Sequence, residues 1–179
     1  DLIELSRLEA STDEAPMTPV DVPALLERLV RDARTAAADV PRFELDIDYG
    51  CALRGSESEI HSIASNLISN AVKYTPADGT ITIRWGRVGG GAVLAVRDTG
   101  IGIAAEHLPR LTERFYRVDR GRARAMGGSG LGLSIVKHAL QRHGGRLEIE
   151  SREGRGSTFT ALFPGRRLLV RAAPVTKAS

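Results

Sequence analysis

The sequence is poor in cysteine and in aromatic residues. Its 179 residues include one cysteine, Cys51, so an internal disulfide is excluded, and no cysteine and histidine cluster with metal-ligand spacing occurs. A reducing, cytoplasmic setting is the simplest expectation. Phenylalanine, tryptophan and tyrosine make up 4% of the residues, which excludes the stacking platform that single-strand nucleic-acid binders use.

Long apolar runs are also missing. No run reaches the length of a membrane span, and no signal-peptide pattern opens the sequence. The sequence starts at Asp1 within a helical pattern, and we expect it to be part of a longer protein. The formal net charge of +3 does not by itself indicate a nucleic-acid partner, and 42% hydrophobic residues suffice for one core.

The order of the periodic segments predicts an α+β domain with flanking pieces. Residues 1–12 resemble the end of an amphipathic helix, and residues 13–20 contain the two prolines of an expected linker. We expect the domain itself to cover residues 21–164, followed by a disordered basic tail over residues 165–179.

Within the domain, three long helices and several strands are expected. Helical patterns follow the cap Asp21 and cover residues 57–74 and 131–143, and strand patterns cover residues 43–47, 52–55, 80–88, 92–98, 147–150 and 158–163. They predict a two-layer α/β sandwich, with one mixed, mainly antiparallel sheet covered on one face by three helices.

One stretch of the second helix carries a polar stripe. At about 100° per residue, Asn66, Asn70 and Lys73 fall on one side, and isoleucine, leucine and alanine fall mainly on another. An amide oxygen can ligate Mg²⁺, and a lysine can meet a phosphate. An ordinary surface helix fits the same residues, so the stripe alone leaves both interpretations open.

Two glycine-containing stretches and an arginine-rich one follow. Asp98 ends a strand before Gly100 and Gly102, where an ionised carboxylate could accept the exocyclic amine of adenine. The glycines of residues 127–132 precede a helix, as in a phosphate cradle, although the Walker pattern is absent. Arginines at residues 114–117 suit phosphate oxygens, and Phe115 could anchor the loop between them. Each stretch also has a non-functional interpretation. Residues 98–102 could be an ordinary strand-end turn, residues 127–132 a flexible hinge, and residues 114–117 a helix end with surface arginines.

The order and spacing of these four stretches resemble the ATP-binding catalytic domain of the sensor histidine kinases of two-component systems. That family shares a superfamily with gyrase, the heat-shock ATPases and the mismatch-repair ATPases. The matches are residues 66–74 to the N box, 98–102 to the first glycine box, 113–116 to the F box and 128–133 to the second glycine box. The resemblance covers about residues 20–164, and the opening helix looks like the end of a dimerisation helix.

The resemblance implies ATP and Mg²⁺ as ligands. It implies that Asn70 holds the metal, that Asn66 and Lys73 bind phosphates, and that Tyr74 and Asp98 flank the adenine. The catalytic candidates are Asn66, Lys73, Arg114 and Arg117. The nucleotide-binding candidates are Asn66, Asn70, Lys73, Tyr74, Asp98, Gly100, Gly102, Ile103, Phe115, Arg120, Gly128, Ser129, Gly130, Leu131, Gly132 and Leu133.

The implied function is transfer of the γ-phosphoryl group of ATP to a histidine on a dimerisation domain. The implied partners are that domain and a response regulator, in a cytoplasmic part of a bacterial inner-membrane kinase. This piece would be monomeric and the full-length protein a homodimer. Residues 83–88, 109–119 and 128–133 give a narrower likeness to the phosphate-regulon sensor kinases, although Thr112 stands where many family members have phenylalanine. The alternatives are an anti-sigma-type serine kinase and a non-catalytic nucleotide-binding module.

One departure from the wider superfamily concerns hydrolysis. Hydrolysing relatives carry a glutamate at the position of Asn66, which is a poor base, and Glu59 lies on the same helical side but about 10 Å away along the axis. We therefore expect this domain to keep ATP for transfer.

Autophosphorylation of the isolated chain is not expected. The family's phosphorylated histidine sits in a Ser-His-Glu-Leu-Arg-Thr-Pro context, which none of His61, His107, His138 and His143 has. Purified chain incubated with ATP labelled in its γ-phosphate should carry no label after separation from nucleotide. Stable label on the chain alone would overturn this prediction.

Overall fold

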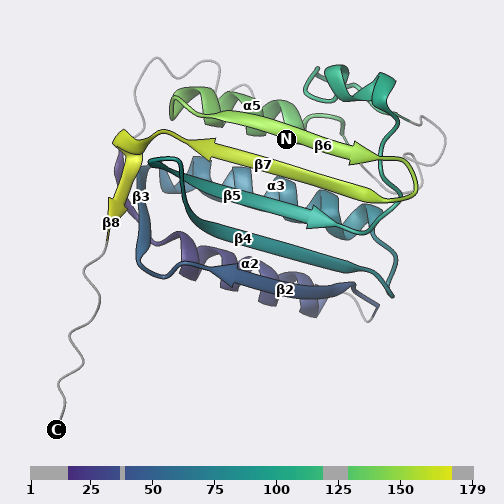
Figure 1. The fold of residues 1–179 in the computed structure, drawn as a ribbon, viewed down its shortest axis with the longest axis horizontal. Helices are drawn as coiled ribbons and strands as arrows, with labels where there is room; N and C mark the ends of the chain where they lie inside the picture. Colours follow the sequence, from purple (N-terminus) through teal and green to yellow (C-terminus); the bar gives the residue numbers. More distant parts are fainter. Residues whose placement is uncertain (1–15, 37–38, 119–128, 171–179) are drawn as a thin grey trace, which may run out of the picture.

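The computed structural model describes residues 16–36, 39–118 and 129–170, which build two sheets and three main helices (Figure 1). The elements in chain order are β1 (Thr18–Val20), α2 (Val22–Ala36), β2 (Arg42–Ile47), β3 (Cys51–Gly55), α3 (Glu57–Tyr74), β4 (Thr80–Val88), β5 (Gly91–Asp98), the 3-10 helix η1 (Ala105–Arg110), α5 (Gly132–Arg142), β6 (Arg146–Arg152), β7 (Gly156–Phe163), the 3-10 turn η2 (Gly165–Arg167) and β8 (Leu168–Val170). The expected dimerisation helix, residues 1–12, lies outside the described ranges.

The larger sheet is mixed and mainly antiparallel, as the sequence predicts. Its strand order is β2-β4-β5-β7-β6, and the pair β2 and β4 is parallel while the other pairs are antiparallel. Helices α2, α3 and α5 lie together on one face of this sheet (Figure 1). Within the described ranges, no helix has both the length and the apolar character needed to span a membrane.

A second sheet corrects two expectations about the ends of the domain. The expected linker includes β1, and the expected disordered tail includes β8; both pair antiparallel with β3 in a three-stranded sheet. Each of these strands has only three residues, which is too short to carry a periodic signal, and their pairing depends on the edges that β3 presents. Residues 171–179 lie outside the described ranges.

The core fills the space between the helices and the larger sheet. Strand β4 alternates buried Ile81, Ile83 and Trp85 with more exposed residues, as expected for a sheet with one covered face. Helix α3 buries the apolar side that its period predicts, namely Ile60, Ile63, Ala64, Leu67, Ile68 and Ala71. Edge strand β2 is less covered, and its Leu45 is 40% exposed.

The ends of α3 have clear chemical causes. The Ser56 hydroxyl caps the first turn by accepting a hydrogen bond from the Glu59 backbone N–H at 3.4 Å. At the other end, the Thr75 hydroxyl donates to the Ala71 carbonyl at 2.6 Å, and Pro76 follows without an N–H to continue the helix. These ends fix which residues of the polar stripe lie within the helix.

A buried polar cluster joins the start of α3 to the end of α5. His143 is fully buried; its Nδ1 lies 2.8 Å from the Ala139 carbonyl, and its Nε2 accepts the Ser56 backbone N–H at 3.1 Å. This arrangement needs the neutral ring with its proton on Nδ1. Burial lowers the pKa of His143, although the Ala139 carbonyl and the nearby Glu59 carboxylate oppose the shift.

We predict that this histidine makes folding stability depend on pH. Because the pKa of His143 is lowered in the folded protein, the unfolded chain binds the proton first as the pH falls below about 6.5. The free energy of unfolding, followed in urea by Trp85 fluorescence, should therefore fall between pH 7.5 and pH 5.5.

Two variants separate the contribution of His143 to the pH dependence of stability from that of other groups. His143→Gln should cost about 1–3 kcal/mol at pH 7.5 and reduce the pH dependence. His61→Gln, on the exposed side of α3, should keep the parental pH dependence. Equal pH dependence in His143→Gln and the parent would contradict the assignment.

Candidate nucleotide-binding site

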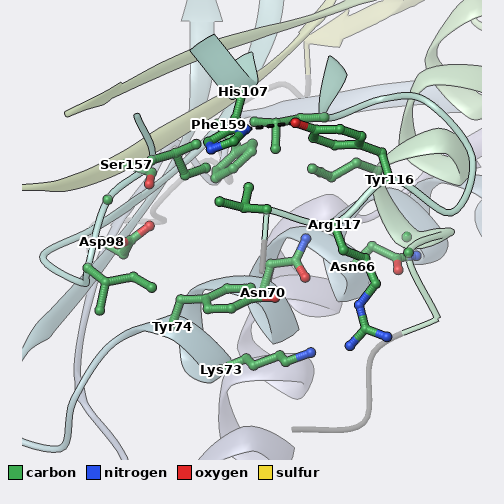
Figure 2. Close-up of a pocket in the computed structure, with 18 of the residues that line it drawn as sticks. Asn66, Asn70, Lys73, Tyr74, Asp98, His107, Tyr116, Arg117, Ser157 and Phe159 are labelled. Carbon is green, nitrogen blue, oxygen red and sulfur yellow. Dashed lines mark hydrogen bonds between the residues drawn. The ribbon is translucent and has the colours of Figure 1, made fainter. Parts of the chain in front are cut away.

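A cavity of about 600 Å³ lies where α3, the end of β5 and the start of α5 meet. The segment from Ile101 to Val118 closes another side, and Glu153, Ser157 and Phe159 reach it from the β6–β7 region. Figure 2 shows Asp98 and Tyr74 toward one end of the cavity and Asn66 and Arg117 toward the other, with Asn70 between them. Elements distant in sequence thus contribute to one site.

The polar stripe of α3 faces this cavity. Asn66, Asn70 and Lys73 all line it, together with Ser69 and Tyr74. The Asn66 side-chain NH₂ donates to the Ser62 carbonyl at 2.8 Å, which turns the amide oxygen toward Gly132 at the start of α5. The Lys73 ammonium lies 5.2 Å from the centre of the Tyr74 ring. The helix therefore presents two amides and a cation along one wall.

Asp98 supplies the buried acceptor of the cavity. Its side chain is 5% exposed and accepts the Gly100 backbone N–H at 2.8 Å. Burial raises the pKa of Asp98, while hydrogen bonds from the Gly100 and Ser157 backbones act in the opposite direction. Ile103 and Phe159 line the cavity beside it. A carboxylate in an apolar slot suits an amino group on a flat ring.

The glycines after Asp98 permit close contacts that a side chain would block. A Cβ on Gly100 would overlap the Tyr74 carbonyl, although Gly100 itself does not line the cavity. Gly102 does line it, and its φ of +66° places it in the left-handed region, against the Arg152 backbone. The loop is thereby held between α3 and the β6–β7 turn.

The arginine-rich stretch is only partly turned toward the cavity. Arg117 lines it, and the Arg117 Nη2 atom is buried without a hydrogen-bond partner among the described residues. Arg114 does not line it. Phe115 is not the buried anchor that the sequence suggested, because its side chain is 62% exposed. Its backbone, at φ of 61°, instead donates an N–H to the Gly130 carbonyl at 2.9 Å.

The second glycine stretch brings the start of α5 to the cavity. Ser129, Gly130, Gly132 and Leu133 line it, whereas Leu131 is buried beneath. Gly132 is the first residue of α5, so the free N–H groups of the first turn lie at the cavity edge. Arg120 and Gly128 lie outside the described ranges.

Several lining residues were missed from the sequence. The cavity also contains Ser69, Ile101, Ala104, His107, Leu111, Tyr116, Val118, Glu153, Ser157 and Phe159. Ser157 reaches the site because it pairs with Asp98 across β5 and β7, a register that no local pattern reveals. Tyr116 could have been found, since it stands directly between Phe115 and Arg117.

Glu59 does not line the cavity. Its side chain is 6% exposed, and its Oε1 lies 2.7 Å from the Arg142 Nε. It belongs to the buried cluster around His143 at the other end of α3. Glu59 therefore pairs with Arg142 and does not face the cavity. A base that activates water would have to face the ligand.

The chain belongs to the family of histidine kinase-, DNA gyrase B- and HSP90-like ATPases, whose sequence profile matches residues 55–167. Among curated proteins, the phosphate regulon sensor protein PhoR of Pseudomonas aeruginosa is 54% identical over 164 residues, which are 91% of this chain and 37% of PhoR. The sensor-like histidine kinase SenX3 of Mycobacterium tuberculosis is 42% identical over 166 residues, 92% of this chain and 40% of SenX3. The chain thus spans well under half the length of these relatives.

Solved structures agree with the sequence relatives. The solved chain of the mycobacterial sensor histidine kinase MprB has a TM-score of 0.73 at 29% identity, over 84% of this chain and 99% of that chain. Full-length ShkA, in complex with AMPPNP, has a TM-score of 0.81 at 26% identity, over 97% of this chain and 36% of ShkA. The resemblance to sensor histidine kinases predicted from the four motifs is confirmed.

Two glycines offer a matched test of the close contacts. Gly102 and Gly154 both have positive φ, +66° and +73°, but a Cβ on Gly102 would overlap the Arg152 carbonyl, whereas one on Gly154 would meet nothing within 4 Å. Gly154→Ala should cost about 1 kcal/mol of unfolding free energy, and Gly102→Ala about 3 kcal/mol or more. Urea titration measures both, and equal costs would contradict the close packing of this loop.

Proposed function

We propose that this chain is the ATP-binding catalytic part of a sensor histidine kinase. In this proposal it binds Mg²⁺-ATP and transfers the γ-phosphoryl group to a histidine on the kinase's dimerisation domain. The observation that carries the proposal is the Arg117 guanidinium, whose Nη2 is buried at the cavity without a described partner. A buried cationic donor is costly unless an anion meets it, so this end of the cavity suits phosphate oxygens.

The two ends of the cavity match the two ends of ATP. Asp98 would accept the adenine amine, and Tyr74 and Ile103 would flank the ring. Lys73, Arg117 and the start of α5 would meet the phosphates. Phosphoryl transfer requires mainly positioning and neutralisation of charge, which amides, cations and backbone N–H groups supply.

Magnesium would depend on few protein atoms. The described residues contain no group of three or more histidine, cysteine and acidic side chains that could hold a metal. Asn70 lines the cavity in the middle of the polar stripe, and Mg²⁺ in such sites commonly takes one or two protein ligands plus phosphate oxygens and water. Bound there, Mg²⁺ would neutralise phosphate charge.

The site also supports transfer over rapid hydrolysis. Asn66 stands where hydrolysing relatives have a glutamate, and an amide is a poor base for activating water. Glu59 is held by Arg142 away from the cavity. We therefore expect slow ATP hydrolysis by the isolated chain.

The cellular role is proposed from the relatives. Identity of 54% to a phosphate regulon sensor protein supports a role in phosphate-starvation signalling, with a response regulator as downstream partner. The domain proposed for this activity covers about residues 21–164 together with strands β1 and β8. We propose that it is the cytoplasmic part of a bacterial inner-membrane kinase, a homodimer when full length.

Calorimetry with ATP and Mg²⁺ tests the binding step. The unmutated chain should bind, Asp98→Ala should weaken binding at least about tenfold through loss of the buried acceptor, and Asn70→Asp should alter the dependence on Mg²⁺. The matched control is Asp46→Ala, on β2, which removes an exposed ion-pair partner of Arg84. This variant should bind ATP with the parental affinity. Absence of ATP binding by the folded, unmutated chain would refute the proposed function.

A further inference from the structure

Tyr116 is held at two places by residues of η1. Its hydroxyl lies 2.7 Å from the His107 Nδ1 (Figure 2), and the Arg110 guanidinium carbon lies 4.3 Å from the centre of its ring. Arg110 is itself paired with Glu113 at 3.1 Å. A hydrogen bond at the tip and a cation on the ring face leave the side chain little freedom.

The residue that follows Tyr116 is Arg117. The backbone on its N-terminal side is fixed by two hydrogen bonds, from the Phe115 N–H to the Gly130 carbonyl at 2.9 Å and from the Tyr116 N–H to the Glu113 carbonyl at 3.3 Å. Figure 2 shows the Tyr116 hydroxyl directed toward His107 and the Arg117 guanidinium directed the other way, toward Lys73.

This arrangement addresses a physical problem at Arg117. A long cationic side chain with a buried nitrogen that has no partner among the described residues would gain free energy by turning to water. Keeping the Arg117 side chain toward the cavity before an anion binds therefore requires an adjacent residue with a fixed conformation, and Tyr116 is that residue.

We propose that the hydrogen bond between His107 and Tyr116 positions Arg117 for the phosphate end of the nucleotide. This inference rests on the proposed function and adds two positioning residues, neither of which is among the site residues predicted from the sequence. Tyr116 and His107 act through Arg117, so their effect should depend on the phosphates of the ligand and on the presence of the arginine.

The test is a double-mutant cycle measured by calorimetry with ATP and with adenosine. Tyr116→Phe keeps the ring and its contact with Arg110 but removes the hydroxyl. It should weaken ATP binding about fivefold, as expected for one lost hydrogen bond, and leave adenosine binding unchanged. In an Arg117→Ala background, Tyr116→Phe should have no further effect on ATP, because interacting residues are non-additive.

Two variants of His107 and one control variant complete the double-mutant cycle. His107→Leu should reproduce Tyr116→Phe, while His107→Gln, which can still hydrogen-bond the tyrosine, should retain more ATP affinity. Tyr49→Phe is the matched control, since the Tyr49 hydroxyl makes a hydrogen bond of the same 2.7 Å length, donated to Glu27, but lies outside the cavity lining. It should leave both affinities unchanged.

The outcomes separate this inference from the function on which it rests. Equal weakening of ATP and adenosine by Tyr116→Phe would indicate a general structural role and overturn the inference. The same fivefold loss with and without Arg117 would indicate direct contact between Tyr116 and the ligand, which also overturns it. ATP binding that Arg117→Ala does not weaken overturns the inference and the phosphate-binding role of Arg117, but ATP binding by the chain still stands. No ATP binding by the unmutated chain overturns the proposed function as a whole.

Discussion

The packing of α3 against the larger sheet is the contact on which the site depends. Ile60, Ile63 and Leu67 are almost completely buried, and moving such side chains to water costs about 1.5–3 kcal/mol each. Because side chains repeat about every 3.6 residues, burying this face also fixes the direction of Asn70 and Lys73. A change of register by one residue would turn the polar stripe by about 100°, away from the cavity.

Close backbone contacts then set the depth of the cavity. Gly100 lies against the Tyr74 carbonyl, and Gly156 lies against the Asp98 backbone, so the end of β5 is enclosed between α3 and β7. Asp98 is buried as a result, yet backbone N–H groups satisfy its carboxylate. The same enclosure brings Ser157 and Phe159 to the cavity from a distant part of the chain.

The sequence predicted those parts of the fold that have a regular period or a specific end signal. The bounds of α3 and β4 and the cap at Asp21 follow from such local causes. Strands β1 and β8 were missed because their order comes from pairing with β3, which has no local signature.

For the site, the motifs identified the walls that come from α3, β5 and α5. They could not reveal Ser157, which depends on sheet register, or the contact between His107 and Tyr116, which depends on how η1 folds back. They also allowed Phe115 to be an anchor of the loop, whereas a left-handed backbone turns its side chain outward. Motif matching gives residue types at a site, and tertiary structure decides which of them face the ligand.

The central claim is that this chain supplies the catalytic half of a histidine kinase. The most direct test mixes it with ATP labelled in the γ-phosphate and a separately purified dimerisation domain that carries the phosphoacceptor histidine. The account predicts label on that histidine, dependent on Mg²⁺ and lost with Asp98→Ala. Tight ATP binding without transfer of label to the histidine of any dimerisation domain, including that of the 54% identical relative, would contradict it.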